Sequence, residues 1–240
     1  MAKRDRREAP RGEEEETFDS LVDLSSKQWA ELLKDPLALE RAAAKGNRAL
    51  ALRLVGAGAE IGNALFEAVD GGHKELVNDL VESGVPVAAR DTDVWSPLHL
   101  AARLGCVEMV ELLLAKGADK DSLDQHNRTP LYLATEGDHV AAALALLAVG
   151  ADVSIMCSGL FKTSVVHMAA EWGYLEILRA VIEHGADLEV ADEPNYRTAL
   201  HCAATRDRVE AIHVLVEAGA NIEAQGNGGR TPLHYAASHL

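Results

Sequence analysis

One short phrase recurs along the chain at an almost constant spacing. It begins at Ser96 as SPLHLAA and returns as TPLYLAT, SVVHMAA, TALHCAA and TPLHYAA, with NALFEAV from Asn63 as a weaker copy. The copies begin at residues 63, 96, 129, 164, 198 and 231, so the period is 33 to 35 residues. A period of this length indicates an array of similar units that must stack, because each is too small to bury an apolar face alone.

Each copy carries the signals for two short helices. A side chain that can cap a helix opens every phrase, and the capping residues are Asn63, Ser96, Thr129, Ser164, Thr198 and Thr231. The first helix is predicted to end at a left-handed turn, at Gly72, Gly105, Asp138, Gly173 and Asp207. A second helix with aliphatic residues three and four apart follows, and glycine marks its end at residues 58, 84, 117, 150, 185 and 219. The mixed residues before the next cap suit a hairpin-like finger.

The period and the phrase together make the chain resemble the ankyrin-repeat family, whose repeats carry a T-P-L-H-x-A signature. The resemblance covers residues 37–240. It implies an all-α fold, an ankyrin-repeat solenoid of stacked helix-turn-helix units with hairpin-like fingers.

Three units depart from the pattern. Residues 37–62 are interpreted as a degenerate first repeat that lacks most of its finger. The unit at Ser164 has Val165-Val166 in place of Pro-Leu, which predicts a less well set first turn. Residues 231–240 form an incomplete last repeat, with Leu240 where the turn glycine is expected, so we expect a frayed C-terminus and a natural sequence that continues.

Two segments precede the repeats. Residues 1–16 hold a basic block and then four glutamates, a composition that predicts a disordered charged tail, and KRDRR from Lys3 leaves a nuclear-import signal open. Residues 17–36 hold apolar residues at helix spacing, with Ser25 and Gln28 as a capping box ahead of Trp29. We expect a short helix here, either a cap over the first repeat or a docking motif for another protein.

The charge balance bears on the class of partner. With 38 acidic and 23 basic residues the chain has a net charge of −15, which favours a basic protein partner over nucleic acid or a membrane surface. The three cysteines form no C-x-x-C pair, and neither a signal peptide nor a run long enough to span a membrane is present. We expect a cytoplasmic protein, with the nucleus left open, and a monomer.

No pattern of residues points to catalysis, a cofactor or a metal. Four of the ten histidines occupy one repeat position, and the resemblance implies a structural role for His99, His167, His201 and His234, which would bond within the turn and to the neighbouring finger. The chain has no H-E-x-x-H, no Cys/His group at zinc spacing, and no lysine in the glycine-rich stretch QGNGGRT. The acidic pair Asp192-Glu193 is interpreted as solvated charge on a finger.

The resemblance places partner contacts on a concave surface formed by the fingers and the first helices. The family's contact positions fall on Thr92, Asp93, Trp95, Arg103, Leu104, Gln125, His126, Arg128, Glu136, Glu171, Trp172, Asn195, Arg197, Thr205, Arg206, Asn227 and Arg230. Trp95, Arg103, Trp172 and Arg206 are the preferred anchors, because Trp and Arg are frequent interface hot spots. For Trp95 and the finger arginines 128, 197 and 230, packing on the next finger is an equal alternative.

The finger from Val153 to Thr163 is longer and more apolar than the others. If Met156, Cys157, Leu160 and Phe161 are exposed, they form a second candidate contact; otherwise they lie beneath the adjacent finger. The sequence thus predicts a non-enzymatic protein-interaction module, a scaffold or adaptor. The alternative is the N-terminal regulatory part of a longer enzyme, channel or ubiquitin ligase.

Overall fold

The computed structural model describes residues 25–90, 94–158 and 162–238. Over these residues the chain forms helices and one isolated antiparallel bridge, between Lys162 and Glu193, and no β-strand. The elements are α1 (Ser26–Lys34), α2 (Ala38–Ala44), α3 (Arg48–Gly56), α4 (Ala64–Asp70), α5 (Lys74–Glu82), α6 (Pro97–Leu104), α7 (Val107–Ala115), α8 (Pro130–Glu136), α9 (Val140–Ala148), α10 (Val165–Trp172), α11 (Leu175–Glu183), α12 (Ala199–Thr205), α13 (Val209–Glu217), the 3-10 helix η2 (Asn227–Gly229) and α14 (Pro232–Ala237).

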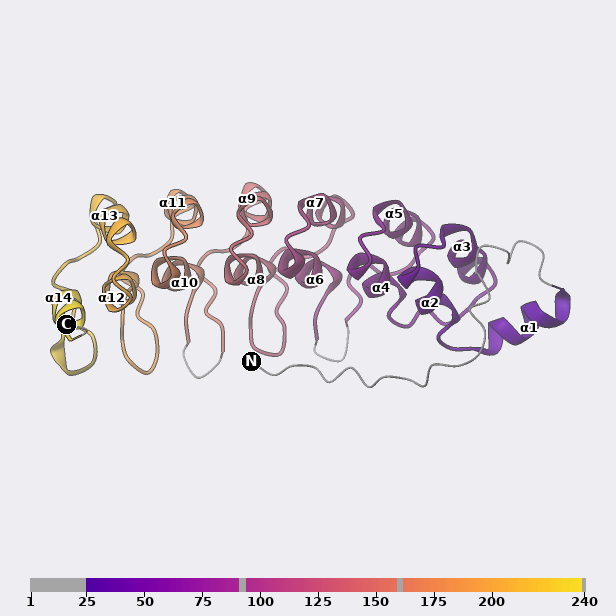
Figure 1. Cartoon of the computed structure of the whole chain (residues 1–240), viewed down its shortest axis with the longest axis horizontal. Helices are drawn as coiled ribbons and strands as arrows, with labels where there is room; N and C mark the ends of the chain where they lie inside the picture. The colour runs from indigo at the N-terminus through magenta and orange to yellow at the C-terminus, as the bar shows by residue number, and fades with distance from the viewer. Residues whose placement is uncertain (1–24, 91–93, 159–161, 239–240) are drawn as a thin grey trace.

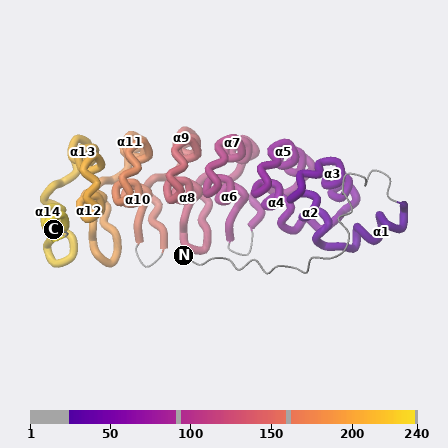
Figure 2. The backbone as a smooth tube through the Cα atoms, in the orientation of Figure 1, coloured from indigo at the N-terminus to yellow at the C-terminus, as the bar shows by residue number. Residues whose placement is uncertain are grey.

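Helix pairs stack side by side in a single row (Figure 1). The inner helices α2, α4, α6, α8, α10, α12 and α14 form one layer, and the outer helices α3, α5, α7, α9, α11 and α13 form the second. The loops between pairs project as fingers from the side of the inner layer, as the backbone trace in Figure 2 shows. The expected all-α solenoid is confirmed.

Hydrogen bonds at the capping residues set where the inner helices begin. The backbone N–H groups of Ser96, Ser164, Thr198 and Thr231 donate to Nδ1 of the histidine three residues later, at 3.1, 3.3, 3.1 and 3.2 Å. Thr129 instead accepts from the Tyr132 N–H at 3.1 Å. Ser164 bonds Nδ1 of its histidine as Ser96 does. The Ser96 side chain also accepts the backbone N–H of His99 at 3.4 Å, whereas Ser164 makes no such side-chain capping bond, so the less well set first turn of α10 stays a prediction.

Asn63 also differs from the prediction. Its side chain makes no capping bond to α4, and its own N–H donates to Oε1 of Glu40 on α2 at 2.8 Å. The chain before Asn63 is short because the first unit lacks most of its finger. Phe66 stands where four other units have the histidine that accepts this N–H, so a carboxylate from the preceding inner helix accepts it instead.

Left-handed residues end the inner helices where the sequence predicts them. Gly105 has φ 68° and Gly173 φ 76°, while Asp138 and Asp207 lie in the same region at 53° and 55°. Space matters at Gly105 as well, since a Cβ there would lie 2.5 Å from Nδ1 of His139. The glycines that follow the outer helices also have positive φ, namely Gly58, Gly84, Gly117, Gly150, Gly185 and Gly219.

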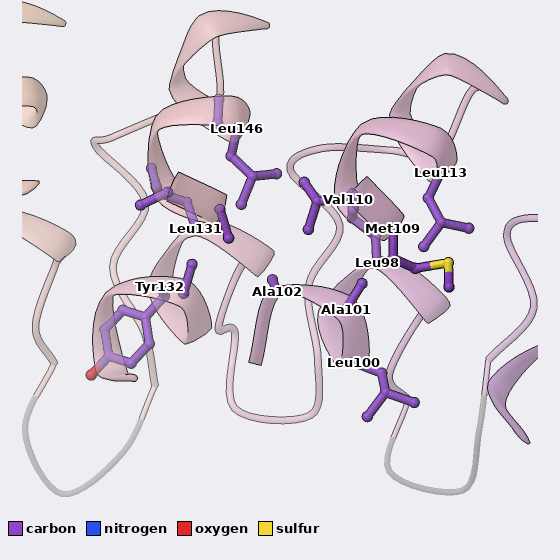
Figure 3. Close-up of a cluster of buried hydrophobic side chains, with 14 of the residues drawn as sticks. Leu98, Leu100, Ala101, Ala102, Met109, Val110, Leu113, Leu131, Tyr132 and Leu146 are labelled. Carbon is purple, nitrogen blue, oxygen red and sulfur yellow. The ribbon is translucent and has the colours of Figure 1, made fainter. Parts of the chain in front are cut away.

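A continuous apolar core runs between the two layers, from Ala38 to Ala220. The buried pair Ala101-Ala102 carries only methyl groups, so α6 can approach α4 and α8 closely. Leu98, Met109 and Leu113 fill the space between α6 and α7 (Figure 3). Each large aliphatic side chain buried in this way contributes roughly 1.5–3 kcal/mol. Stacking, rather than any single unit, therefore builds the core.

Helix α1 lies at one end of the stack, beside the first helix pair (Figure 1). Ser25 and Gln28 form the predicted capping box. No α1 residue is fully buried, but Trp29 packs partly against the core, and the Arg53 guanidinium lies 4.6 Å from the Trp29 ring centroid. These contacts favour a cap over a free docking motif. The predicted tail at 1–16, and residues 17–24, lie outside the described residues.

Candidate functional site

Three buried histidines connect the inner helices to the fingers. Because Nδ1 accepts from the capping N–H, the ring proton lies on Nε2, which donates to a finger carbonyl. His99 donates to Arg128 O at 3.0 Å, His167 to Arg197 O at 3.1 Å, and His201 to Arg230 O at 3.0 Å. Burial lowers the pKa of all three histidines, so the neutral form that this pattern requires is favoured.

His234 occupies the same repeat position but differs in its surroundings. Its Nδ1 accepts from the Thr231 N–H as in the units of His99, His167 and His201, yet its side chain is exposed. In the part of the chain that the structure describes, no bond joins its Nε2 to a finger carbonyl. On the same helix, α14, the side chain of Leu233 is 76% exposed. Leu240 lies outside the described residues, so the predicted frayed C-terminus stays a prediction.

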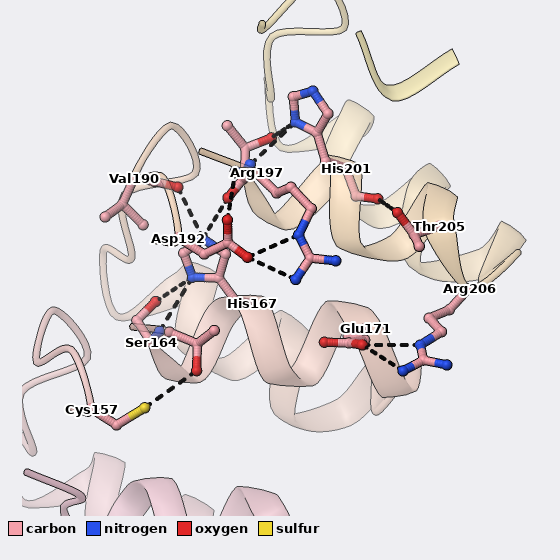
Figure 4. Close-up of polar contacts among 12 residues, drawn as sticks. Cys157, Ser164, His167, Glu171, Val190, Asp192, Arg197, His201, Thr205 and Arg206 are labelled. Atoms are coloured by element: carbon pink, nitrogen blue, oxygen red, sulfur yellow. Dashed lines mark hydrogen bonds and ion pairs between the residues drawn. The ribbon is translucent and has the colours of Figure 1, made fainter. Parts of the chain in front are cut away.

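Buried aspartates fix the shape of two fingers. Asp192 accepts the Arg197 N–H at 2.6 Å and pairs with the Arg197 guanidinium at 2.7 Å (Figure 4). Asp124 makes the same contacts to Arg128, with 2.8 Å for the N–H bond and 2.8 Å for the ion pair. Asp192 is fully buried, so its interpretation as solvated charge was wrong; only Glu193 beside it is exposed.

The electrostatics of Asp124 follow from these contacts. Burial raises the pKa of its carboxyl, but hydrogen bonds from the backbone of Arg128 and His126 and from the Arg128 guanidinium outweigh that effect and lower the pKa. The carboxylate is therefore charged and bonded at neutral pH. The guanidinium groups of Arg128 and Arg197 therefore pair with a carboxylate of their own finger, and not with the next finger as the packing alternative expected.

Trp95 lies between two of the other predicted contact residues. The Arg103 guanidinium lies 4.6 Å and the Arg128 guanidinium 5.7 Å from its ring centroid, both within the range of a cation–π contact. Arg128 also pairs with Glu136 at 3.5 Å, whereas Leu104 next to Arg103 is exposed. The structure therefore brings Trp95, Arg103, Arg128 and Glu136 into one cluster that joins two fingers, α6 and α8.

The other predicted anchors meet at a hollow on the inner face, the surface formed by the inner helices and the fingers. Trp172 is 49% exposed, and the Arg206 guanidinium lies 5.6 Å from its ring centroid. Arg206 also pairs with Glu171 at 2.9 Å (Figure 4). The hollow measures about 380 Å³, and its lining residues are Tyr132, Thr163, Met168, Glu171, Trp172, Asn195, Arg197 and Arg206. Residues from α8, from α10, from the C-terminal end of α12 and from two fingers thus line a hollow beside one half-exposed indole.

The remaining candidate residues are dispersed. His126, Asn227 and Arg230 are exposed on their fingers, and the His126 carbonyl accepts the Ser158 N–H of the next finger at 2.6 Å. In the long finger Cys157 is buried, and its Sγ lies 3.3 Å from Oγ1 of Thr163 in the same finger. Thr92 and Asp93, and the proposed contacts Leu160 and Phe161, lie outside the described residues.

Sequence reasoning missed one set of contacts between repeats. The residue that precedes the outer helix reaches back to a carbonyl near the end of the previous inner helix. His73 bonds Ala44 O at 3.1 Å, His139 bonds Arg103 O at 2.9 Å, and Arg208 bonds Glu171 O at 3.2 Å. All three stand ten residues after a capping residue, so the period itself could have found them.

The described residues also bear on two other classes of site. No group of three or more His, Cys, Asp or Glu side chains is placed to hold a metal ion there. A helix long and apolar enough to cross a membrane is likewise not found in that part of the chain.

Comparison with known proteins agrees with the period, the fold and the caps. A family model described as ankyrin repeats (3 copies) matches residues 39–124, 65–157, 116–192 and 166–240. The chain belongs to the ankyrin-repeat family. Ankyrin repeats mediate protein–protein interaction, so the fold supplies a recognition scaffold.

Similar ankyrin-containing proteins are much longer. The chain is 31% identical over 171 residues to the transient receptor potential cation channel subfamily A member 1 of Drosophila melanogaster, which is 71% of the chain and 12% of that relative. It is 34% identical over 164 residues to the nuclear factor NF-kappa-B p105 subunit of Gallus gallus, which is 68% of the chain and 13% of that relative. With human diacylglycerol kinase iota it shares 35% identity over 85 residues, 35% of the chain and 8% of the relative. The chain therefore spans a small part of the relatives it matches.

Proposed function

We propose that this ankyrin array is a non-enzymatic interaction module, a scaffold or adaptor, that binds a partner protein on its inner face at the Trp172 hollow. The half-exposed Trp172 carries the proposal. An indole buries a large area when a partner covers it, and Trp and Arg are frequent interface hot spots. The Arg206–Glu171 pair holds the guanidinium beside the ring before any partner arrives, so less side-chain entropy is lost on binding.

Trp95 is the weaker anchor of the two. Its ring already contacts the guanidinium groups of Arg103 and Arg128, and it packs partly against the core. A partner would gain less from a side chain whose faces are occupied. We expect Trp172 and Arg206 to contribute more than Trp95 and Arg128.

A capture experiment tests the proposal. The wild-type chain and a Trp172→Ala/Arg206→Ala variant are used as baits in extracts of the native cell, and bound proteins are quantified by mass spectrometry. The matched control is Val209→Ala/Arg179→Ala, which removes one exposed apolar residue and one exposed arginine from outer helices. We expect partners that the inner-face variant loses and the control retains. Equal capture by all three baits would refute the site.

The relatives motivate a second candidate, that the array regulates a longer enzyme or channel. The named relatives include a cation channel, of which the matched region covers 12%, and a diacylglycerol kinase, of which it covers 8%. Reading the natural transcript past the codon for Leu240 separates the two. An open frame that encodes a catalytic or channel domain favours the second candidate, and a stop codon favours the first.

Charge gives the proposal a further check. The net charge of −15 favours a basic partner, and an association steered by charge weakens with added salt. We also expect the free chain to be a monomer, without affinity for nucleic acid. Light scattering and binding measured across a salt series test these expectations.

A further inference from the structure

Equivalent positions of the outer helices can be compared between units by counting from the capping residue of each unit. Twelve residues after the capping residue, four units carry glutamate, at Glu75, Glu108, Glu176 and Glu210. The unit of α9 carries Ala141 at that position. At the end of the outer helix, Ala115 and Ala148 likewise stand where the other units have Glu82, Glu183 and Glu217. Helix α9 contains no charged residue, unlike α5, α7, α11 and α13.

The difference lies on the surface of α9 rather than in the core. Ala142, Ala143, Leu146 and Leu147 are the buried residues of this helix. Leu144 is 43% and Val149 47% exposed, and Ala141 and Ala148 are exposed beside them. Leu144 stands where other outer helices have Asn78, Glu111, Arg179 and His213. Packing inside the array therefore does not account for these apolar side chains.

This surface is hollowed between α7 and α9. A groove of about 470 Å³ is lined by Leu114, Ala115, Ala118, Ala145, Ala148 and Val149, with Glu111 and Lys120 as its charged members. We call these residues, together with Leu144, the outer groove. The outer groove is lined by residues of α7, of α9 and of the segments that follow these helices, and it shares no lining residue with the inner-face hollow.

The charges beside the outer groove are mainly acidic. Glu108 and Glu111 on α7 and Glu176 and Glu183 on α11 are exposed, with Arg179 as an exposed base on α11. The two lysines at the end of α7 already have carboxylate partners, because Lys116 Nζ lies 2.8 Å from Glu82 and Lys120 pairs with Asp121. An occupant of the outer groove therefore meets apolar surface in the middle and exposed carboxylates at the sides.

We propose that the outer groove binds an amphipathic helix of a partner protein, with alanine- and leucine-sized residues on its apolar face and lysine or arginine along both flanks. A groove between two parallel ridges of small side chains suits a helix, whose anchors recur every three to four residues. The flanking carboxylates favour basic flanks and disfavour acidic ones. They also oppose a second copy of this chain, which would present the same carboxylates, and an anionic membrane.

The test uses the full chain and a synthetic peptide of about 20 residues, long enough to populate a helix, with Leu and Ala on one face and Lys on the flanks. A control peptide carries Glu in place of every Lys. Binding is measured by calorimetry or fluorescence anisotropy. Ala148→Glu places in α9 the residue that α11 carries as Glu183, so this variant should fold, and a thermal melt verifies that it does.

We expect the basic peptide to bind the wild type and Trp172→Ala equally, and to bind Ala148→Glu about tenfold or more weakly because a carboxylate is then buried against the apolar face. Glu108→Lys/Glu111→Lys should also weaken binding. Equal affinity for wild type and Ala148→Glu would overturn the proposal. So would preference for the acidic peptide, a wild-type dimer in light scattering that Ala148→Glu dissolves, or binding to phosphatidylserine vesicles that Ala148→Glu abolishes.

Discussion

Replacing Asp192 by alanine removes the carboxylate that shapes the finger between α11 and α12. The side chain is fully buried, accepts the Arg197 N–H at 2.6 Å, and pairs with the Arg197 guanidinium at 2.7 Å. The substitution leaves Arg197, whose side chain is only 13% exposed, without its carboxylate. Breaking a buried pair from one side costs roughly 3–5 kcal/mol, and we expect about 3 kcal/mol because Arg197 keeps some access to water.

The magnitude can be measured by thermal unfolding followed by far-ultraviolet circular dichroism. For a chain of this size, a loss of about 3 kcal/mol lowers the melting temperature by roughly 6–12 °C. The neighbouring residue supplies a matched control, because Glu193 pairs with Lys162 at 2.8 Å while both side chains are about half exposed. Glu193→Ala should cost less than about 1 kcal/mol. If Asp192→Ala destabilises the chain no more than Glu193→Ala does, the buried-pair reasoning fails.

Three further predictions concern stability. Burial lowers the pKa of His99, His167 and His201 in the folded chain. Below a pH of about 6.5, the usual pKa of histidine, the unfolded chain therefore binds more protons than the folded chain, and the free energy of unfolding falls as the pH drops. Thermal melts from pH 8 to pH 5 that show no such fall would contradict this. Gly105→Ala should destabilise the chain by about 1 kcal/mol or more beyond the cost of Gly117→Ala. Both glycines have positive φ, but only Gly105 lies against His139. Chemical denaturation of the two variants measures the difference. Trp29→Ala should lower the melting temperature if α1 caps the stack, and an unchanged melt would favour the docking motif.

Features that recur with the period could be predicted from the sequence. The caps at Ser96 and Thr198 and the left-handed turns at Gly105 and Asp207 each depend on residues close along the chain. Such contacts recur in several units, so one correct interpretation applies to each of those units. The resemblance to the ankyrin family supplied the rest of the architecture.

Side-chain partners from neighbouring units were harder to predict. The burial of Asp192 depends on how its finger folds back to Arg197, and composition alone made this residue look solvated. The backbone N–H of Asn63 donates to Glu40, which is 23 residues earlier, and no local pattern around Asn63 indicates this contact. At the inner-face hollow, the sequence named Trp172 and Arg206 from their repeat positions. The contacts of Arg206 with Glu171 and the Trp172 ring required the folded helices.

The hydrogen bonds of the buried histidines also define where one repeat can be separated from the next. His99 bonds the carbonyl of Arg128, the last residue before the cap Thr129, and His201 bonds that of Arg230, the last before Thr231. A segment cut immediately before each capping residue keeps the histidine and the finger that it holds in the same piece. A cut at the glycine that follows the outer helix, such as Gly117, separates them. Deletions, insertions and transplanted repeats should therefore be joined at the capping residues, where the covalent unit and the hydrogen-bonded unit coincide.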